Sequence, residues 1–119
     1  MTWLELHRWF GWFVVASNGV AGAWVLAAHW RNDLRSKLLW RVVLVAQASI
    51  GVELMLGVLA QQSNGSEATG LHMFYGFIAF ATVGILYSYR QQLEAWRYLL
   101  YGFGGLFLMG LAMRSMGWI

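Results

Sequence analysis

Two histidines stand near the start of apolar segments, and each is followed by a glycine four residues later. The segment LHRWFGW contains His7 and Gly11, and LHMFYGF contains His72 and Gly76. On a helix, residues four apart share one face. Imidazole is a common metal ligand, and a glycine lets a flat group lie close to the backbone. The pattern predicts that His7 and His72 ligate the iron of one heme b, with Gly11 and Gly76 making room for its ring.

Two arginines are placed to assist such a site. Arg8 follows His7 directly, and Arg114 lies near the carboxyl end of the chain. Arginine pairs well with carboxylates, so we expect both to hold heme propionates. Contact with lipid headgroups is the alternative for the two arginines. A histidine near a helix end is also commonly an interfacial residue, and glycine is a routine packing residue in membrane helices.

The composition places these residues in a membrane protein. Of the 119 residues, 60% are hydrophobic and 11% are charged, with no cysteine. Soluble proteins carry about 25% charged residues. The lack of cysteine excludes disulfides and thiol chemistry. The net charge of +3 is too small, for a chain this apolar, to suggest nucleic-acid binding.

Four apolar stretches are long enough to cross a hydrocarbon core of about 30 Å as helices. They cover residues 3–29, 38–60, 71–89 and 93–113, and a polar, turn-rich loop is expected at 61–70. Thr2 and Glu5 match a capping box for the first helix, and Thr69 is expected to cap the third. The sequence therefore predicts a single all-α domain of four transmembrane helices.

The basic residues indicate an orientation. One end of the expected bundle, the basic end, carries six of them: Arg31, Arg35, Lys37, Arg41, Arg90 and Arg97. The other end, the histidine end, carries only Arg8 and Arg114. Because cytoplasmic loops are enriched in Lys and Arg, we expect both termini outside a bacterial cytoplasmic membrane, with the histidines near its extracytoplasmic face.

An internal repeat supports an up-down-up-down bundle. Residues 1–62 and 69–119 each read as a helical hairpin that opens on the Leu-His motif. Helices one and three would then lie on a diagonal. Neighbouring helices are roughly 8–10 Å apart, so the diagonal is about 11–14 Å, which leaves room for one metal between the two imidazoles.

Glu53 is the one carboxylate well inside an expected span. It stands eight residues before Gln61, about 12 Å from that helix end at 1.5 Å per residue. Intramembrane ionisable residues are functional candidates. Glu53 is either a proton-transfer group beside a redox centre or quinone, or the donor or acceptor of an inter-helix or inter-subunit hydrogen bond. The small residues around Asn18 and the glycines 102, 104 and 105 are expected to serve close helix packing.

The motif Glu5-Leu6-His7-Arg8 at a helix start, together with Leu71-His72, resembles heme A synthase. That family has two four-helix halves, each with a histidine pair near the extracytoplasmic side. This chain is similar to one half, or to other four-helix membrane b-type cytochromes. The resemblance implies that His7 and His72 are heme ligands and that Glu5 is the nearby carboxylate. In the family the carboxylate precedes the histidine by three residues, whereas Glu5 precedes His7 by two.

Three functions follow from these features. The first is a heme b subunit for electron transfer, with a quinone or a larger respiratory complex as partner. The second is a cofactor-free accessory or assembly subunit, whose many aromatic side chains, including 8 Trp, would pack on other subunits or on copies of itself. The third is a small proton-coupled exporter using Glu53. Such exporters carry their glutamate on helix one and have a weak charge bias, and this chain differs in both respects.

Overall fold

A computed structural model describes residues 2–64 and 70–116, and this part of the chain is entirely helical outside its turns. It contains four α-helices and two short 3₁₀-helices, which are α1 (Trp3–Trp30), η1 (Asn32–Leu34), α2 (Lys37–Asn64), α3 (Gly70–Ser88), η2 (Glu94–Trp96) and α4 (Arg97–Ser115). The predicted all-α class with four long helices is confirmed for these residues.

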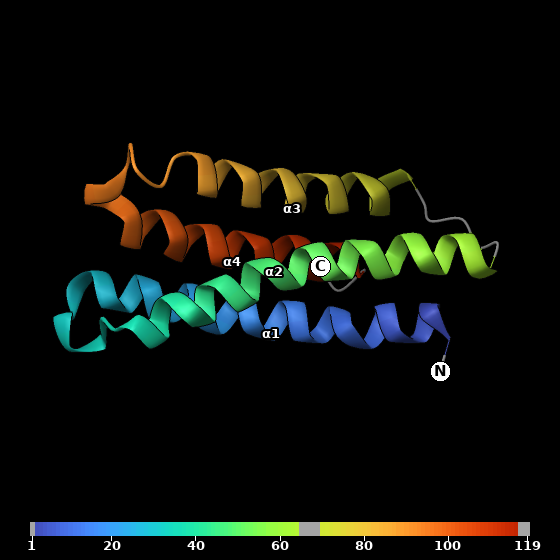
Figure 1. Ribbon diagram of the computed structural model, residues 1–119, viewed down its shortest axis with the longest axis horizontal. Coiled ribbons are helices and arrows are strands. Elements are labelled where there is room, and N and C mark those ends of the chain that lie inside the picture. Colours follow the sequence, from blue (N-terminus) through green and yellow to red (C-terminus); the bar gives the residue numbers. More distant parts are fainter. Residues whose placement is uncertain (1, 65–69, 117–119) are drawn as a thin grey trace.

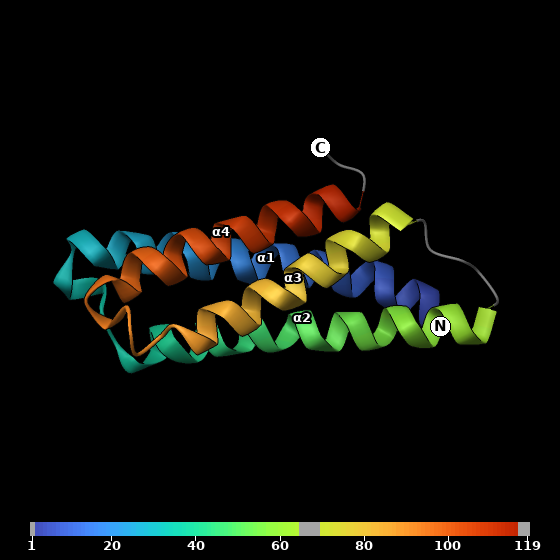
Figure 2. The ribbon, with the colours of Figure 1, turned by 90° about the horizontal axis from the view of Figure 1, so that it is seen from above.

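Successive helices run antiparallel in one elongated bundle (Figure 1). Helix α1 packs closely against both α2 and α4, and α3 is held mainly by α4. Few contacts join α2 to α3, and α3 runs obliquely to α1 and α2 while tilting in the same sense as α4 (Figure 2). Helices α1 and α3 are therefore the diagonal pair, as expected for an up-down-up-down bundle.

The helix ends show where local sequence decides the boundary. Helix α1 starts at Trp3 because the Thr2 hydroxyl accepts a hydrogen bond of 3.1 Å from the Glu5 amide, which confirms Thr2 as the cap. Helix α2 continues to Asn64. The predicted loop from Gln61 was wrong at its start, since the sequence Gln-Gln-Ser-Asn at 61–64 contains no glycine or proline to end the helix. The expected cap Thr69 lies outside the described residues.

Helix α4 begins at Arg97, four residues later than predicted. The preceding residues form a turn and the short helix η2. At this basic end the Arg35 guanidinium lies 4.3 Å from the centre of the Tyr98 ring and donates 2.8 Å from Nε to the Ala28 carbonyl. Arg35 thus links the turn after α1 to the start of α4.

Glycines bring α1 and α4 into backbone contact. A methyl group on Gly22 would lie 2.7 Å from the Leu106 nitrogen, and one on Gly105 would lie 2.8 Å from the Gly22 Cα. Next to this contact, buried Asn18 donates 3.2 Å from Nδ2 to the Ala46 carbonyl of α2. The predicted close packing with inter-helix hydrogen bonds is confirmed here.

Two of the helices are long and apolar enough to cross a membrane. These are α1 and the 37–62 part of α2, whereas the apolar part of α3, residues 72–88, is shorter. At 1.5 Å per residue, the 28 residues of α1 or α2 extend about 42 Å and the 19 residues of α3 or α4 about 28 Å. A crossing by all four helices, with both termini outside, stays a prediction.

Candidate functional site

At the histidine end, each of the four helices contributes one polar residue to a common cluster. The cluster consists of His7 from α1, Glu53 from α2, His72 from α3 and Ser115 from α4. The structure thus brings together the two predicted histidines and the predicted Glu53, and it adds Ser115.

His7 is held by Glu53 through two contacts of one ring nitrogen. Its Nδ1 lies 3.0 Å from Glu53 Oε1 and 3.2 Å from the Glu53 backbone oxygen. The side chains of His7 and Glu53 are only 17% and 16% exposed. A backbone carbonyl can only accept a hydrogen bond, so Nδ1 is the donor. In the neutral imidazole, the lone pair is then on Nε2.

His72 is held in the same way by α4. Its Nδ1 lies 3.0 Å from the Ser115 backbone oxygen and 2.8 Å from the Ser115 hydroxyl. The carbonyl again identifies Nδ1 as the donor and Nε2 as the nitrogen that would bind a metal. Metal-ligating histidines usually donate their second ring nitrogen to a carboxylate or a backbone carbonyl, and both histidines meet that pattern.

The two imidazoles extend toward each other across the diagonal between α1 and α3, so the rings are much closer than the axes of these two helices are expected to be. Their ring centroids are 5.7 Å apart, with an angle of 87° between the ring planes. Two imidazoles on opposite sides of one metal, with bonds of about 2.0 Å, would have centroids about 6 Å apart. The separation of the centroids is close to this value.

Helices α1 and α2 each place a polar side chain against a glycine of the other helix. A methyl group on Gly57 would lie 3.1 Å from Cε1 of His7, and one on Gly11 would lie 2.8 Å from Oε2 of Glu53. Each polar side chain thus occupies the space beside a glycine of the opposite helix. In the structure, Gly11 makes room for Glu53, whereas the sequence predicted room for a macrocycle.

The other predicted glycine has a different neighbour. Among the described residues, a methyl group on Gly76 would meet the Leu54 side chain alone, 3.1 Å away at Cδ2. Beside Gly11, the further neighbour is the flexible side chain of Met116. The neighbouring atoms at both glycines are thus side-chain atoms, in contrast to the backbone contact at Gly22. The neighbours of these two glycines can consequently give way by side-chain movement, which the backbone beside Gly22 cannot do.

The two predicted arginines lie on the same end of the bundle. Arg114 is exposed, and its Nε donates 3.3 Å to the Tyr75 hydroxyl, which joins α4 to α3. Arg8 is exposed on α1, next to His7. Their roles toward propionates stay predictions.

Glu5, the carboxylate implied by the family resemblance, is exposed in the first turn of α1. The carboxylate that touches a histidine is Glu53 instead.

Sequence reasoning missed Gly57, Ser115 and Tyr75 as members of the site. Gly57 had a recognisable signal, because it follows Glu53 by four residues just as Gly11 follows His7. Ser115 acts partly through its backbone carbonyl, which residue type does not reveal.

No cluster of three or more His, Asp or Glu side chains able to hold a metal ion occurs among residues 2–64 and 70–116.

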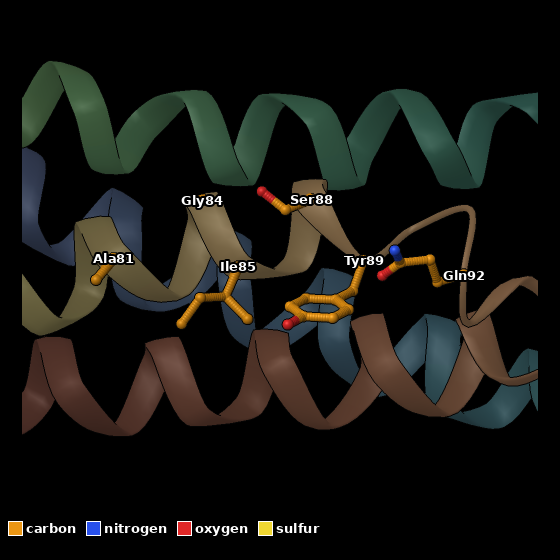
Figure 3. Close-up of a pocket in the computed structure, with 6 residues that line it drawn as sticks. All are labelled: Ala81, Gly84, Ile85, Ser88, Tyr89 and Gln92. Carbon is orange, nitrogen blue, oxygen red and sulfur yellow. The ribbon is translucent and has the colours of Figure 1, made fainter.

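A surface hollow of about 570 Å³ lies away from this cluster, at the basic end of α3 (Figure 3). It is lined by Ala81, Gly84, Ile85, Ser88, Tyr89 and Gln92. From His72 to Ser88 the helix rises about 24 Å. The hollow is therefore a separate feature from the histidine cluster.

Comparison of the chain with protein-family models, with curated proteins and with solved structures gives no match.

Proposed function

We propose that this chain is a membrane-embedded heme b protein that transfers electrons at the histidine end of its bundle. The observation that supports the proposal is the meeting of His7 and His72, whose ring centroids are 5.7 Å apart and whose Nδ1 atoms are both held by the protein. Because Nδ1 of each ring donates to the protein, Nε2 is the atom proposed to ligate the iron.

The donor set favours a metal in a macrocycle over a bare ion. Structural zinc sites, for example, use four protein ligands, and here two imidazoles lie close together, nearly perpendicular to each other. A porphyrin supplies the four remaining ligands of its iron, and heme iron exchanges one electron. Side chains on facing helices of four-helix bundles are a common setting for such cofactors.

In this proposal different residues ligate the iron, hold the ligands, bind the propionates and make room for the ring. His7 and His72 ligate the iron, while Glu53 and Ser115 hold the two rings in place. Arg114, positioned by the Tyr75 hydroxyl, and exposed Arg8 pair with the propionates. Gly76, which lies beside the movable Leu54 side chain, makes room for the ring.

The setting is a membrane. Large apolar side chains are exposed along all four helices, including Val20, Leu44, Phe77 and Phe103, and lipid would cover them. The basic end would face the cytoplasm by the positive-inside rule. Electron exchange would then occur near the outer face, with a quinone, another respiratory subunit or a second copy of the chain as partner.

The proposal is tested by visible absorption of the protein purified in detergent, in the oxidised and reduced states. We expect a Soret band in the wild type that His7→Ala and His72→Ala each abolish or shift. His29→Ala is the matched control, because His29 lies at the basic end of α1 and its loss should leave the spectrum unchanged. A colourless protein that inserts correctly would contradict the proposal and leave the accessory-subunit role.

A further inference from the structure

We infer that Arg35 and Arg97 bind the phosphate of an anionic phospholipid at the basic end of the bundle. Arg35 lies in the turn after η1, and Arg97 is the first residue of α4. This end is opposite to the histidine cluster. The inference therefore shares the membrane setting with the proposed function and is independent of heme.

Both guanidinium groups lie against one aromatic ring. The guanidinium carbon of Arg35 is 4.3 Å from the centre of the buried Tyr98 ring, and that of Arg97 is 5.2 Å from the same centre. The two carbons are consequently at most about 9.5 Å apart. A phosphate that accepts hydrogen bonds from two guanidinium groups on opposite sides separates their carbons by about 8 Å. One phosphate is therefore able to reach both groups.

Aromatic rings hold Arg97 in position. Its guanidinium carbon is 5.1 Å from the centre of the Trp40 ring, and its Nη2 donates 3.5 Å to the Tyr98 hydroxyl. The Trp40 and Tyr98 rings are themselves 5.3 Å apart between centroids. A ring face attracts a cation at such distances without neutralising it. Arg97 is thus a half-buried cation whose position is fixed and whose charge is retained.

The donors of both groups are largely left for another acceptor. Among residues 2–64 and 70–116, neither arginine forms an ion pair with a carboxylate. A guanidinium group has five N–H donors. Arg35 uses two of them on the Ala28 and His29 carbonyls, and Arg97 uses one on Tyr98. Paired donors in this fork geometry are suited to phosphate oxygens.

Arg31, in the same turn, is in the opposite situation. Its Nε and Nη2 donate 3.3 Å and 2.9 Å to the two carboxylate oxygens of Asp33. The turn therefore contains one arginine that is paired within the protein and one that is not. This contrast supplies a matched control.

An apolar surface hollow favours a lipid as the source of the phosphate. The hollow, of about 560 Å³, is lined along α4 by Trp96, which directly precedes Arg97, and by Leu100, Phe103 and Phe107. Trp96, Phe103 and Phe107 are more than half exposed. An acyl chain would cover these side chains, whereas a free phosphate ion would not. Basic side chains at the cytoplasmic ends of helices attract anionic lipid headgroups.

The test is native mass spectrometry of the purified protein, which gives the dissociation constant of the first bound lipid. We expect phosphatidylglycerol to bind at least fivefold more tightly than phosphatidylcholine, because the ammonium group of the latter would face the guanidinium groups. Millimolar inorganic phosphate, added as competitor, should leave phosphatidylglycerol bound.

Arg97 is the residue to replace, because Arg35 also holds the carbonyls at the end of α1. Arg97→Gln should weaken phosphatidylglycerol binding at least tenfold. Arg97→Lys keeps the charge but loses the fork of donors, and it should weaken binding at least threefold. Arg31→Gln removes the same charge from the same end, and its dissociation constant should stay within twofold of the wild type.

The remaining outcomes would overturn the inference. Equal losses in Arg97→Gln and Arg31→Gln, or full binding by Arg97→Lys, would show diffuse attraction by the basic end without a built site. Displacement of the lipid by inorganic phosphate would assign the site to free phosphate. None of these results depends on heme, so an absent Soret band with the expected lipid selectivity would contradict the proposed function alone.

Discussion

The glycine contact between α1 and α4 makes a quantitative prediction for Gly105→Ala. A methyl group on Gly105 would lie 2.8 Å from the Gly22 Cα, 3.1 Å from the Gly22 nitrogen and 3.1 Å from the Asn18 oxygen. All three atoms belong to the backbone of α1, so no side-chain rotation relieves the overlap. Adding a methyl group to a packed core costs about 1–3 kcal/mol. We expect a loss of unfolding free energy at the upper end of this range.

Gly110→Ala is the matched control. It makes the same change on the same helix, but no atom of residues 2–64 and 70–116 outside the helix itself lies within 4 Å of the added methyl group. Alanine is favoured over glycine in a helix interior by up to about 1 kcal/mol, so this variant should be as stable as the wild type or slightly more stable. The difference between the two variants removes the propensity term, leaving the contact with α1.

The measurement is a denaturant titration of both variants in mixed micelles, with tryptophan fluorescence reporting helix separation. The predicted difference in unfolding free energy between Gly110→Ala and Gly105→Ala is about 1–3 kcal/mol, toward the upper end of that range, and it reports overpacking alone. If the two variants unfold at the same denaturant fraction, the close approach of α1 and α4 is refuted.

Two further substitutions test other contacts. Asn18→Ala removes the hydrogen bond to the Ala46 carbonyl and should lower the unfolding free energy by about 1–2 kcal/mol in the same titration; an unchanged midpoint would contradict a role for that bond. Gly57→Ala places a methyl group 3.1 Å from Cε1 of His7, so the ring must shift and heme affinity should fall about tenfold. Gly51→Ala is the control on the same helix, because the added methyl group would have no described neighbour within 4 Å. It should retain full affinity in a heme titration, and equal losses in both variants would argue against the His7 contact.

The helices were predictable because continuous apolarity at helix length admits few alternatives. The start of α1 was also predictable, since Thr2 and Glu5 form a local signal that needs no tertiary information. The end of α2 was not, because Gln61 and its polar neighbours suit a loop and an exposed helix equally well. The late start of α4 likewise depends on a turn that the apolar pattern does not mark.

The sequence identified most residues of the site but not the contacts between them. The repeated motif correctly singled out His7 and His72 as residues that meet from diagonal helices. The placement of Glu53 beside His7 required knowing that α2 extends past the start of α1 (Figure 1). Counting residues along α2 places Glu53 relative to the end of α2 only. The end of α2 and the start of α1 lie at different heights along the bundle (Figure 1), so the count does not place Glu53 relative to His7. Glu53 was therefore recognised as unusual without its partner being identified.

The reciprocal contacts of His7 with Gly57 and of Glu53 with Gly11 also bear on the evolution of the protein. Replacing either glycine displaces the polar side chain of the opposite helix. Replacing either polar residue leaves the facing glycine with no side chain to accommodate. The four positions should therefore be inherited as a unit across homologues, with losses that occur together. A lineage that abandons the cluster is expected to fill both glycine positions with larger apolar residues, while Gly22 and Gly105, which serve the fold alone, are retained.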